Sequence, residues 1–201
     1  MKVLESFVPK SLQDEVEDYI NSGNFQWTFF DNIAMDYGSK PMVFKNPNIV
    51  NPIGLVNTII DNGQIVSGHY SVFRPILLFL EYHENISIKQ VLRVRVRRTL
   101  RDKSAPVTRY NPPHVDLNRA EPYKSLIYYV SDSDGDSVFF NERFNPETDF
   151  EGELKDTNVT ECFRYPPKKG HGILFDGHQY HSGNSPIDNL HRTIINFDFI
   201  V

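Results

Sequence analysis

The chain has 201 residues and a hydrophobic content of 39%, which suits one compact domain with a substantial core. Its formal net charge of −5 gives no general attraction to nucleic acid or to an anionic membrane, so neither partner is expected. The single cysteine, Cys162, excludes an internal disulfide framework. We expect no signal peptide or membrane anchor from the charged N-terminal stretch, and we predict a cytoplasmic location.

The N-terminal part predicts two helices separated by a strand and a long loop. Residues 11–23 place apolar side chains on one helical face, and residues 25–30 have strand composition. Residues 31–54 are rich in Asn, Pro and Gly, which is typical of a loop. Large apolar residues dominate 71–82, which suits either a strand or a buried helix interrupted by Pro75, and we favour the helix.

Residues 92–101, LRVRVRRTLR, alternate arginine with aliphatic side chains. This period of two predicts a half-buried strand whose arginines lie on one face. We interpret that face as solvent-exposed and opposed to acidic neighbours. A polyanion-binding site is the less favoured interpretation, because the rest of the chain is acidic.

The C-terminal half is a series of β-branched and aromatic segments separated by Asp, Gly, Asn or Pro. We predict one domain over 1–201, mainly β with N-terminal helices (α+β). Residues 1–88 would form a helical support with a loop, and residues 89–201 a jelly-roll core of two sheets.

The acidic run SDSDGDS, residues 131–137, does not fit a calcium-binding loop, because the required glycine and glutamate positions are missing. Asp134 and Gly135 instead predict a hairpin turn between the strands on either side.

The stretch NPPHVDLNR contains the first candidate metal ligands. His114 and Asp116 are two positions apart, so on a strand both side chains reach the same side. A third ligand has to come from far along the chain, and the candidates are His171, His178, His181 and His191. His178 and His181 are three positions apart and would point to different faces of a strand, so His178 is interpreted as a turn or surface residue.

Two imidazoles and one carboxylate on one face of a metal form the facial triad of non-haem Fe(II) oxygenases. The opposite face of the metal stays open for substrate and O2. An organic co-substrate needs a second anchor, and Arg192 offers a planar cation suited to a carboxylate.

His-x-Asp, a long gap, a histidine and then a basic residue about ten positions on resembles the signature of the 2-oxoglutarate- and Fe(II)-dependent dioxygenases. The segments IYYVSDSDGDSVFF, GILFDGHQYHSGNSP and RTIINFDF are similar to the prolyl-4-hydroxylase-like branch, and the resemblance covers mainly residues 90–201. It implies a double-stranded β-helix, the cupin-like form of the jelly roll.

The resemblance also implies roles for single residues. His114, Asp116 and His181 would be the iron ligands, and Arg192 would bind the distal carboxylate of 2-oxoglutarate. Tyr129 would add a hydroxyl to the same carboxylate. Ile127 shares the face of Tyr129 on the predicted strand, whereas Tyr128 points to the opposite side, so Ile127 is included in the expected co-substrate site.

The implied activity is oxidative decarboxylation of 2-oxoglutarate coupled to hydroxylation of a C–H bond. Expected cofactors and co-substrates are Fe(II), 2-oxoglutarate and O2, with ascorbate as a supporting reductant. The expected partner is a small-molecule or peptidyl substrate, such as a prolyl residue or a free amino acid. Halogenases of the superfamily lack the carboxylate ligand, so the presence of Asp116 favours hydroxylation.

Two other functions stay open at this point. One is a non-catalytic, cupin-like module that binds a metal or another ligand. The other is a zinc hydrolase, since two histidines and a carboxylate also suit catalytic zinc. The hydrolase hypothesis leaves Arg192 and the pair of tyrosines without a role, and it ranks last.

Overall fold

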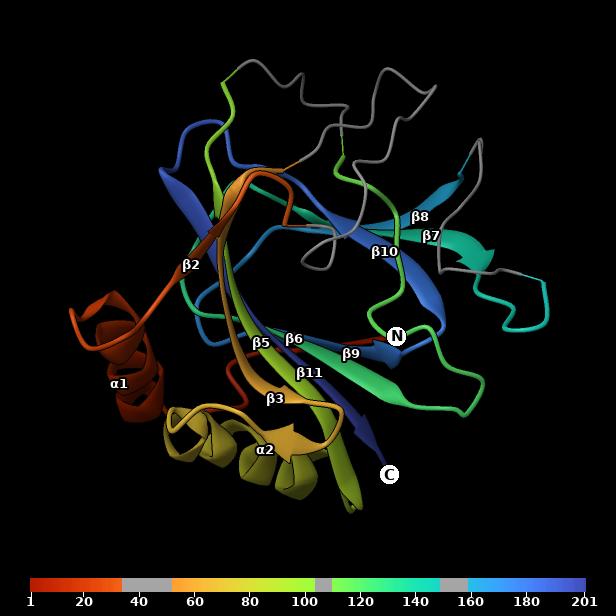
Figure 1. Cartoon of the computed structure of the whole chain (residues 1–201), viewed down its shortest axis with the longest axis horizontal. Coiled ribbons are helices and arrows are strands. Elements are labelled where there is room, and N and C mark those ends of the chain that lie inside the picture. The colour runs from red at the N-terminus through yellow and green to blue at the C-terminus, as the bar shows by residue number, and fades with distance from the viewer. Residues whose placement is uncertain (34–51, 104–109, 149–158) are drawn as a thin grey trace.

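Two antiparallel sheets face each other, and two helices cover the outer face of the larger one (Figure 1). This arrangement is seen in a computed structural model, which describes residues 1–33, 52–103, 110–148 and 159–201. The predicted fold class, mainly β with N-terminal helices and a jelly-roll core, is confirmed.

The larger sheet takes in strands from both halves of the chain. Seven of its strands lie in the spatial order β1 (Lys2–Leu4), β9 (Gly172–Asp176), β6 (Lys124–Tyr129), β11 (His191–Ile200), β5 (Gln90–Leu100), β3 (Gly54–Asp61) and β2 (Thr28–Phe30). The eighth strand, β4 (Gln64–Ile65), lies outside this order and pairs with β3. The smaller sheet consists of β10 (Gln179–Gly183), β7 (Ser137–Arg143) and β8 (Glu161–Tyr165).

Helices α1 (Lys10–Asn21) and α2 (Tyr70–Glu84) pack on the outer face of the larger sheet (Figure 1). Both were predicted from the sequence and are confirmed. Their buried residues join one hydrophobic cluster with the outward-facing residues of the sheet, including Ile195 and Phe197. Within the described residues, neither helix is long and apolar enough to cross a membrane.

Strand β11 shows how the sheet separates an apolar layer from a polar one. Its odd-numbered residues from Ile195 to Phe199 pack against the helices. Because side chains alternate along a strand, the even-numbered residues point to the space between the two sheets. These inward residues are Arg192, Ile194, Asn196 and Asp198.

The arginines of β5 do not form a solvent-exposed face, and this prediction was wrong. Arg93 and Arg97 are only 4% and 9% exposed. Strand β5 lies between β11 and β3, with helices covering one face of the sheet and the smaller sheet facing the other. The alternation was read correctly, but the arginine face is the inner face of the barrel.

Two further expectations differ from the structure. Strand β3 was not predicted, although it pairs with β5 along most of its length.

The predicted hairpin around Asp134 and Gly135 is wrong, because β6 and β7 belong to different sheets and the segment between them crosses from one to the other. Asp134 instead accepts hydrogen bonds from the backbone N–H groups of residues 187–189. The predicted loop at 31–54 lies largely outside the described residues.

We predict that the packing of α2 on the sheet is essential for stability. Phe73 is fully buried, so Phe73→Ala should lower the free energy of unfolding by about 3–5 kcal/mol in urea titrations. Tyr82, on the same helix and 83% exposed, is the matched control, and Tyr82→Ala should change the free energy of unfolding by less than about 0.5 kcal/mol. Equal effects of the two substitutions would contradict this account of the core.

Candidate metal and co-substrate site

His114 and His181 are brought side by side by their own backbones. They form an isolated antiparallel bridge, in which each N–H donates to the other residue's carbonyl at 2.9 and 3.0 Å. Residues directly opposite each other across such a bridge project their side chains to the same side. The two imidazole rings accordingly lie with their centroids 4.7 Å apart.

Each histidine is oriented by a backbone carbonyl. Nδ1 of His114 is 2.9 Å from the oxygen of Pro112, and Nδ1 of His181 is 3.1 Å from the oxygen of Gln179. A carbonyl can only accept, so each Nδ1 carries the proton and each Nε2 presents a lone pair. Both Nε2 atoms are buried and have no hydrogen-bond partner among the described residues. This is the tautomer and orientation that a metal ligand requires.

Asp116 completes a cluster with these histidines. One ligand atom from each of His114, Asp116 and His181 lies within 4.8 Å of the others. Oδ2 of Asp116 is 3.3 Å from Nε2 of His181, so two electron-rich atoms face each other where a cation would fit. Two nitrogen donors and one carboxylate oxygen suit Fe(II), and the three residues fit the facial set that such an ion uses.

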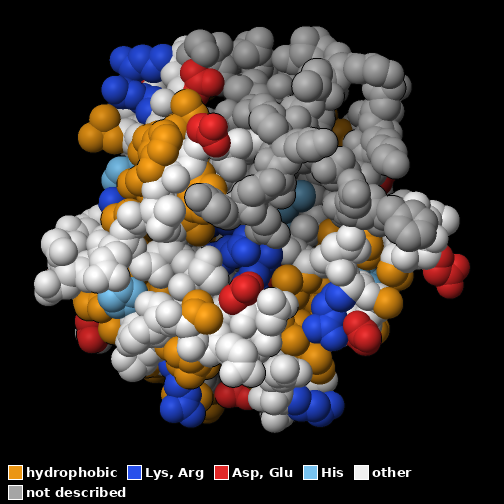
Figure 2. Space-filling view, viewed as in Figure 1, with side chains coloured by type: hydrophobic (Ala, Val, Ile, Leu, Met, Phe, Trp, Pro, Cys, Tyr) orange, Lys and Arg blue, Asp and Glu red, His pale blue; other side chains and the backbone are white. Residues whose placement is uncertain are grey.

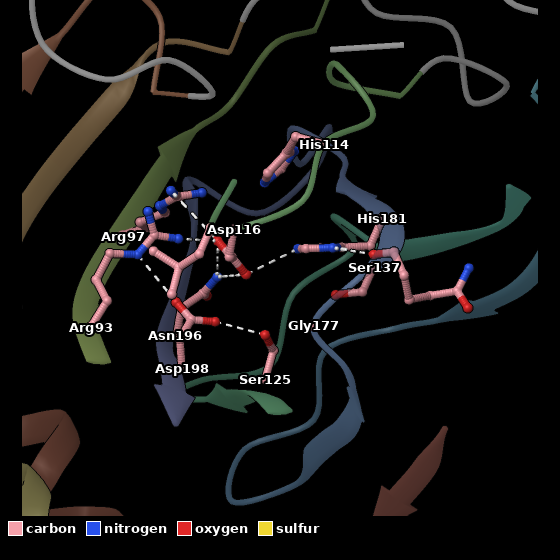
Figure 3. A network of polar contacts seen from close by, with 12 residues as sticks. Arg93, Arg97, His114, Asp116, Ser125, Ser137, Gly177, His181, Asn196 and Asp198 are labelled. Atoms are coloured by element: carbon pink, nitrogen blue, oxygen red, sulfur yellow. Dashed lines mark hydrogen bonds and ion pairs between the residues drawn. The ribbon is translucent and has the colours of Figure 1, made fainter. Parts of the chain in front are cut away.

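The other oxygen of Asp116 is held by a buried arginine. Oδ1 accepts from Nη2 of Arg93 at 2.8 Å, and Nδ2 of Asn196 lies 3.2 and 3.1 Å from Oδ1 and Oδ2 (Figure 3). Burial acts to raise the pKa of Asp116, but His181, Arg93 and Arg97 outweigh it and hold this pKa well below its usual range. Asp116 is therefore a carboxylate at neutral pH.

Arg93 contacts a second buried carboxylate on β11. Its Nε donates to Oδ2 of Asp198 at 3.1 Å, and Ser125 donates to Oδ1 of Asp198 at 2.6 Å (Figure 3). Burial and the proximity of Asp116 raise the pKa of Asp198. One guanidinium thus bridges the candidate metal ligand and a carboxylate deeper in the barrel.

For His114, burial and the neighbouring His181 lower the pKa to about 3. The imidazole is therefore neutral at physiological pH, as a metal ligand must be.

Tyr123 links the two segments that carry the candidate ligands. Its hydroxyl accepts from the N–H of Leu117 at 2.9 Å and donates to the carbonyl of Gly177 at 2.8 Å.

Arg192 lies 4% exposed at the start of β11. Its Nη2 donates to Oγ of Ser137 at 2.6 Å, and the hydroxyl of Tyr129 donates to the same oxygen at 2.8 Å. Among the described residues, no carboxylate lies within ion-pair distance of this guanidinium, and its Nε has no hydrogen-bond partner. A buried cation without a counter-ion is costly, so the geometry fits an anionic ligand.

One pocket joins these groups. Arg192, the two histidines and Ile127 line it, and Tyr129 lies behind the wall with its hydroxyl on Ser137. The described lining residues are Ile33, Pro52, Arg97, Thr99, Asn111, His114, Ile127, His181, Ser182, Gly183, Arg192, Ile194 and Asn196. In the space-filling view, Lys or Arg side chains gather at the centre of this face (Figure 2).

The remaining candidate histidines lie away from the cluster. His178 bonds to the carbonyl of Arg119 through Nε2, and His171 bonds to the hydroxyl of Tyr165 through Nδ1. His191 contacts Oγ1 of Thr193 through Nδ1, on the helix-facing side of β11. Of the four candidates for the third ligand, only His181 reaches His114 and Asp116 in the described part of the chain.

Several residues of the site were missed from the sequence. Arg93 was read as an exposed residue, and Ser137, Asn196 and Asp198 were not singled out. A signal for the last two was present, because Asn196 and Asp198 continue the two-residue period that starts at Arg192 in an otherwise apolar strand. No comparable local signal identifies Ser137.

No family model matches the sequence, and no curated protein matches it. Solved structures do match at the level of the fold. The epimerase SnoN from nogalamycin biosynthesis, in complex with Fe3+, alpha ketoglutarate and nogalamycin RO, is similar with a TM-score of 0.62 and 10% identity, over 98% of this chain and 77% of that chain.

A prolyl hydroxylase from Trichoplax adhaerens, in complex with a peptide fragment of hypoxia inducible factor, has a TM-score of 0.57 and 12% identity over 99% of this chain and 82% of that chain. HygX from Streptomyces hygroscopicus, with nickel and 2-oxoglutarate bound, has a TM-score of 0.54 and 13% identity over 98% and 81% of the two chains. The chain therefore has the jelly-roll fold of the 2-oxoglutarate- and Fe(II)-dependent oxygenases, a fold that prolyl hydroxylases share.

Proposed function

We propose that this protein is a 2-oxoglutarate-dependent Fe(II) oxygenase that hydroxylates a C–H bond of a small-molecule or peptidyl substrate. The observation that carries the proposal is one pocket that contains both His114 and His181, beside Asp116, and the buried Arg192. A metal site alone would suit a zinc hydrolase or a binding module equally well. The second anchor, a buried arginine without a carboxylate partner among the described residues, favours a co-substrate with an anionic end.

Each residue has a distinct task in this proposal. Nε2 of His114, Oδ2 of Asp116 and Nε2 of His181 would hold the metal. Bound Fe(II) with 2-oxoglutarate and O2 supplies the oxidising power to attack an unactivated C–H bond. Arg192 would orient the distal carboxylate of 2-oxoglutarate, with Tyr129 and Ser137 fixing the guanidinium in place.

The surrounding barrel restricts water around the site. Ile127 and Ile194 line the pocket, and Tyr129 and Phe139 pack behind them in one hydrophobic cluster. Apolar walls lower the local dielectric, which strengthens the interaction of Arg192 with an anion and keeps a reactive centre from bulk solvent.

Arg93 has a positioning role in the same site. By holding Oδ1 of Asp116, it leaves Oδ2 as the oxygen directed at His181 and favours binding of the metal through one oxygen. Its charge also offsets two buried carboxylates that would otherwise repel each other.

The first prediction concerns co-substrate binding. Anaerobic titration of Fe(II) and 2-oxoglutarate into the protein should produce a weak visible charge-transfer band. Arg192→Ala should weaken 2-oxoglutarate binding by about tenfold or more, because a charge-assisted hydrogen bond is lost. Arg192→Lys keeps the charge and should retain the band at higher ligand concentration. Folded parent protein that gives no band would favour the non-catalytic binding module.

The second prediction concerns turnover. With Fe(II), 2-oxoglutarate and O2, the protein should form succinate slowly even before its substrate is known. Asp116→Ala should reduce succinate formation to the background without protein, because the metal loses its anionic ligand. Asp188→Ala replaces an exposed aspartate and serves as the control. Unchanged succinate formation by Asp116→Ala would refute the assignment of this ligand.

The third prediction concerns the buried arginine. Arg93→Met should lower the free energy of unfolding by about 3–5 kcal/mol, because it leaves buried carboxylates without their nearest cation. Adding Asp198→Asn removes one of these charges and should restore part of the loss. Arg101→Met, at an exposed arginine just after β5, should change the free energy of unfolding by less than about 0.5 kcal/mol. Urea unfolding of the metal-free proteins measures all three; parental stability in Arg93→Met would contradict this role.

A further inference from the structure

One hydrogen-bond acceptor in the pocket is left without a donor. Asn196 lines the pocket together with His114 and His181 and is only 3% exposed. Its Nδ2 lies 3.2 and 3.1 Å from the two oxygens of Asp116, whereas its Oδ1 is buried and has no hydrogen-bond partner among the described residues. Leaving a buried amide oxygen unpaired costs about 1–3 kcal/mol, so we expect this atom to gain a partner when the site is occupied.

Asp116 fixes the direction in which the amide of Asn196 points. A carboxylate can only accept hydrogen bonds, so the amide atom that faces both of its oxygens is the NH2 group. Turning the amide round would place its oxygen against two other acceptors. The unpaired atom is therefore an oxygen, and only a hydrogen-bond donor can satisfy it. Thr99, another polar lining residue, makes no such demand, because a hydroxyl can either donate or accept.

Asn196 lies between apolar side chains and close to the candidate metal ligands. Ile194 precedes it by two residues on the same face of β11, its register partner on β6 is Ile127, and both isoleucines line the pocket. Oδ2 of Asp116, which Nδ2 contacts, is 3.3 Å from Nε2 of His181. A donor bound to Asn196 would therefore lie beside the metal site, where the low local dielectric strengthens a hydrogen bond.

The co-substrate cannot supply this donor. At neutral pH, 2-oxoglutarate has two carboxylates and a keto oxygen, and all of these groups only accept hydrogen bonds. Arg95, the register partner of Asn196 on β5, does not donate to Oδ1 of Asn196 either. Two sources of a donor remain, which are the primary substrate and a water molecule on the metal.

We propose that Oδ1 of Asn196 accepts a hydrogen bond from the primary substrate, and that the substrate carries an N–H or O–H group next to the C–H bond that is oxidised. This inference rests on the proposed function and narrows it to alcohols, amines and amides that have an N–H. An internal prolyl residue has no N–H, so in a peptide substrate the donor would come from a neighbouring residue. Asn196 is thus a specificity-determining residue, and its NH2 group also orients Asp116.

The test uses Zn(II) in place of Fe(II), so that the loaded protein does not turn over. Acetamide, N-methylacetamide and N,N-dimethylacetamide are titrated into the Zn(II)- and 2-oxoglutarate-loaded protein, and ligand-observed NMR measures their affinities. The N–H groups are lost along this series while the probes become more apolar. We expect the affinity to fall by about fivefold or more from acetamide to the dimethyl compound, because the hydrogen bond to Asn196 is lost. Acetamide that binds no better than the dimethyl compound would overturn the proposal.

Variants assign the effect to the amide oxygen. Asn196→Thr keeps a hydroxyl that can donate to Asp116 but lacks the amide oxygen, so it should reduce the difference between acetamide and the dimethyl compound to about twofold or less. Asn196→Leu removes both amide groups; it should also abolish the difference and, in addition, weaken Zn(II) binding. Asn141→Thr makes the same change at an exposed position of β7 and should preserve the difference. Thermal unfolding of the variants checks that they fold.

Other outcomes have separate meanings. If Asn196→Thr weakens Zn(II) binding but leaves the probe series unchanged, the donor is a water molecule on the metal and the inference is wrong. If the parent protein binds neither metal nor 2-oxoglutarate, the proposed function itself fails. If it binds both and the three probes bind alike, only the substrate assignment is lost.

Discussion

The interior of this barrel depends on one buried guanidinium. Arg93 lies between Asp116 and Asp198 and contacts both at hydrogen-bond distance. Two carboxylates this deeply buried would repel each other and lose their hydration without it. The ion pair fixes strand β5 to β11 on the inner side, and it sets the orientation of Asp116 on the loop that carries the candidate metal ligands. This one side chain therefore contributes to the pairing of β5 with β11, to the orientation of Asp116 and to the charge balance of the interior.

Much of the fold could be predicted because its signals are local. The periodicity of residues 11–23 predicted the first helix, the large apolar residues of 71–82 favoured the second, and β-branched segments predicted most of the C-terminal strands. What local patterns cannot show is which face of a strand becomes the inside of a barrel. The arginines of β5 illustrate this limit, because their alternation was evident but their burial depends on carboxylates far along the chain.

Some residues of the candidate site could likewise be predicted from the sequence, and others could not. His114, Asp116, His181 and Arg192 could be selected from spacing and family resemblance, and the structure brings the first three together beside the pocket that Arg192 lines. Ser137 could not be selected, since its place beside Arg192 and Tyr129 results from the crossing between sheets that was mistaken for a hairpin. Strand β3 was missed because no element was predicted for residues 55–70, between the predicted loop and the second predicted helix.

The fold by itself leaves the reaction partly open. It is shared, at 10–13% identity, with an epimerase, a prolyl hydroxylase and a protein that has nickel and 2-oxoglutarate bound. Function in such a scaffold depends on the residues that line the pocket. In this chain, the described lining carries two arginines, Arg97 of β5 and Arg192 of β11, which makes charge complementarity the main guide to its ligands.

The bridge between His114 and His181 has a consequence for the folding of the chain. It joins an irregular segment after the second proline of NPPH to a strand of the smaller sheet through two backbone hydrogen bonds, and the N–H of Asn111 donates a third to the carbonyl of Gly183. A metal bound by both imidazoles would close the long loop between them and reduce the conformational entropy of the open chain. With a single cysteine, the sequence has no disulfide for this purpose. The metal would then act as a removable cross-link, so that the availability of the ion sets how firmly this segment is held to the smaller sheet.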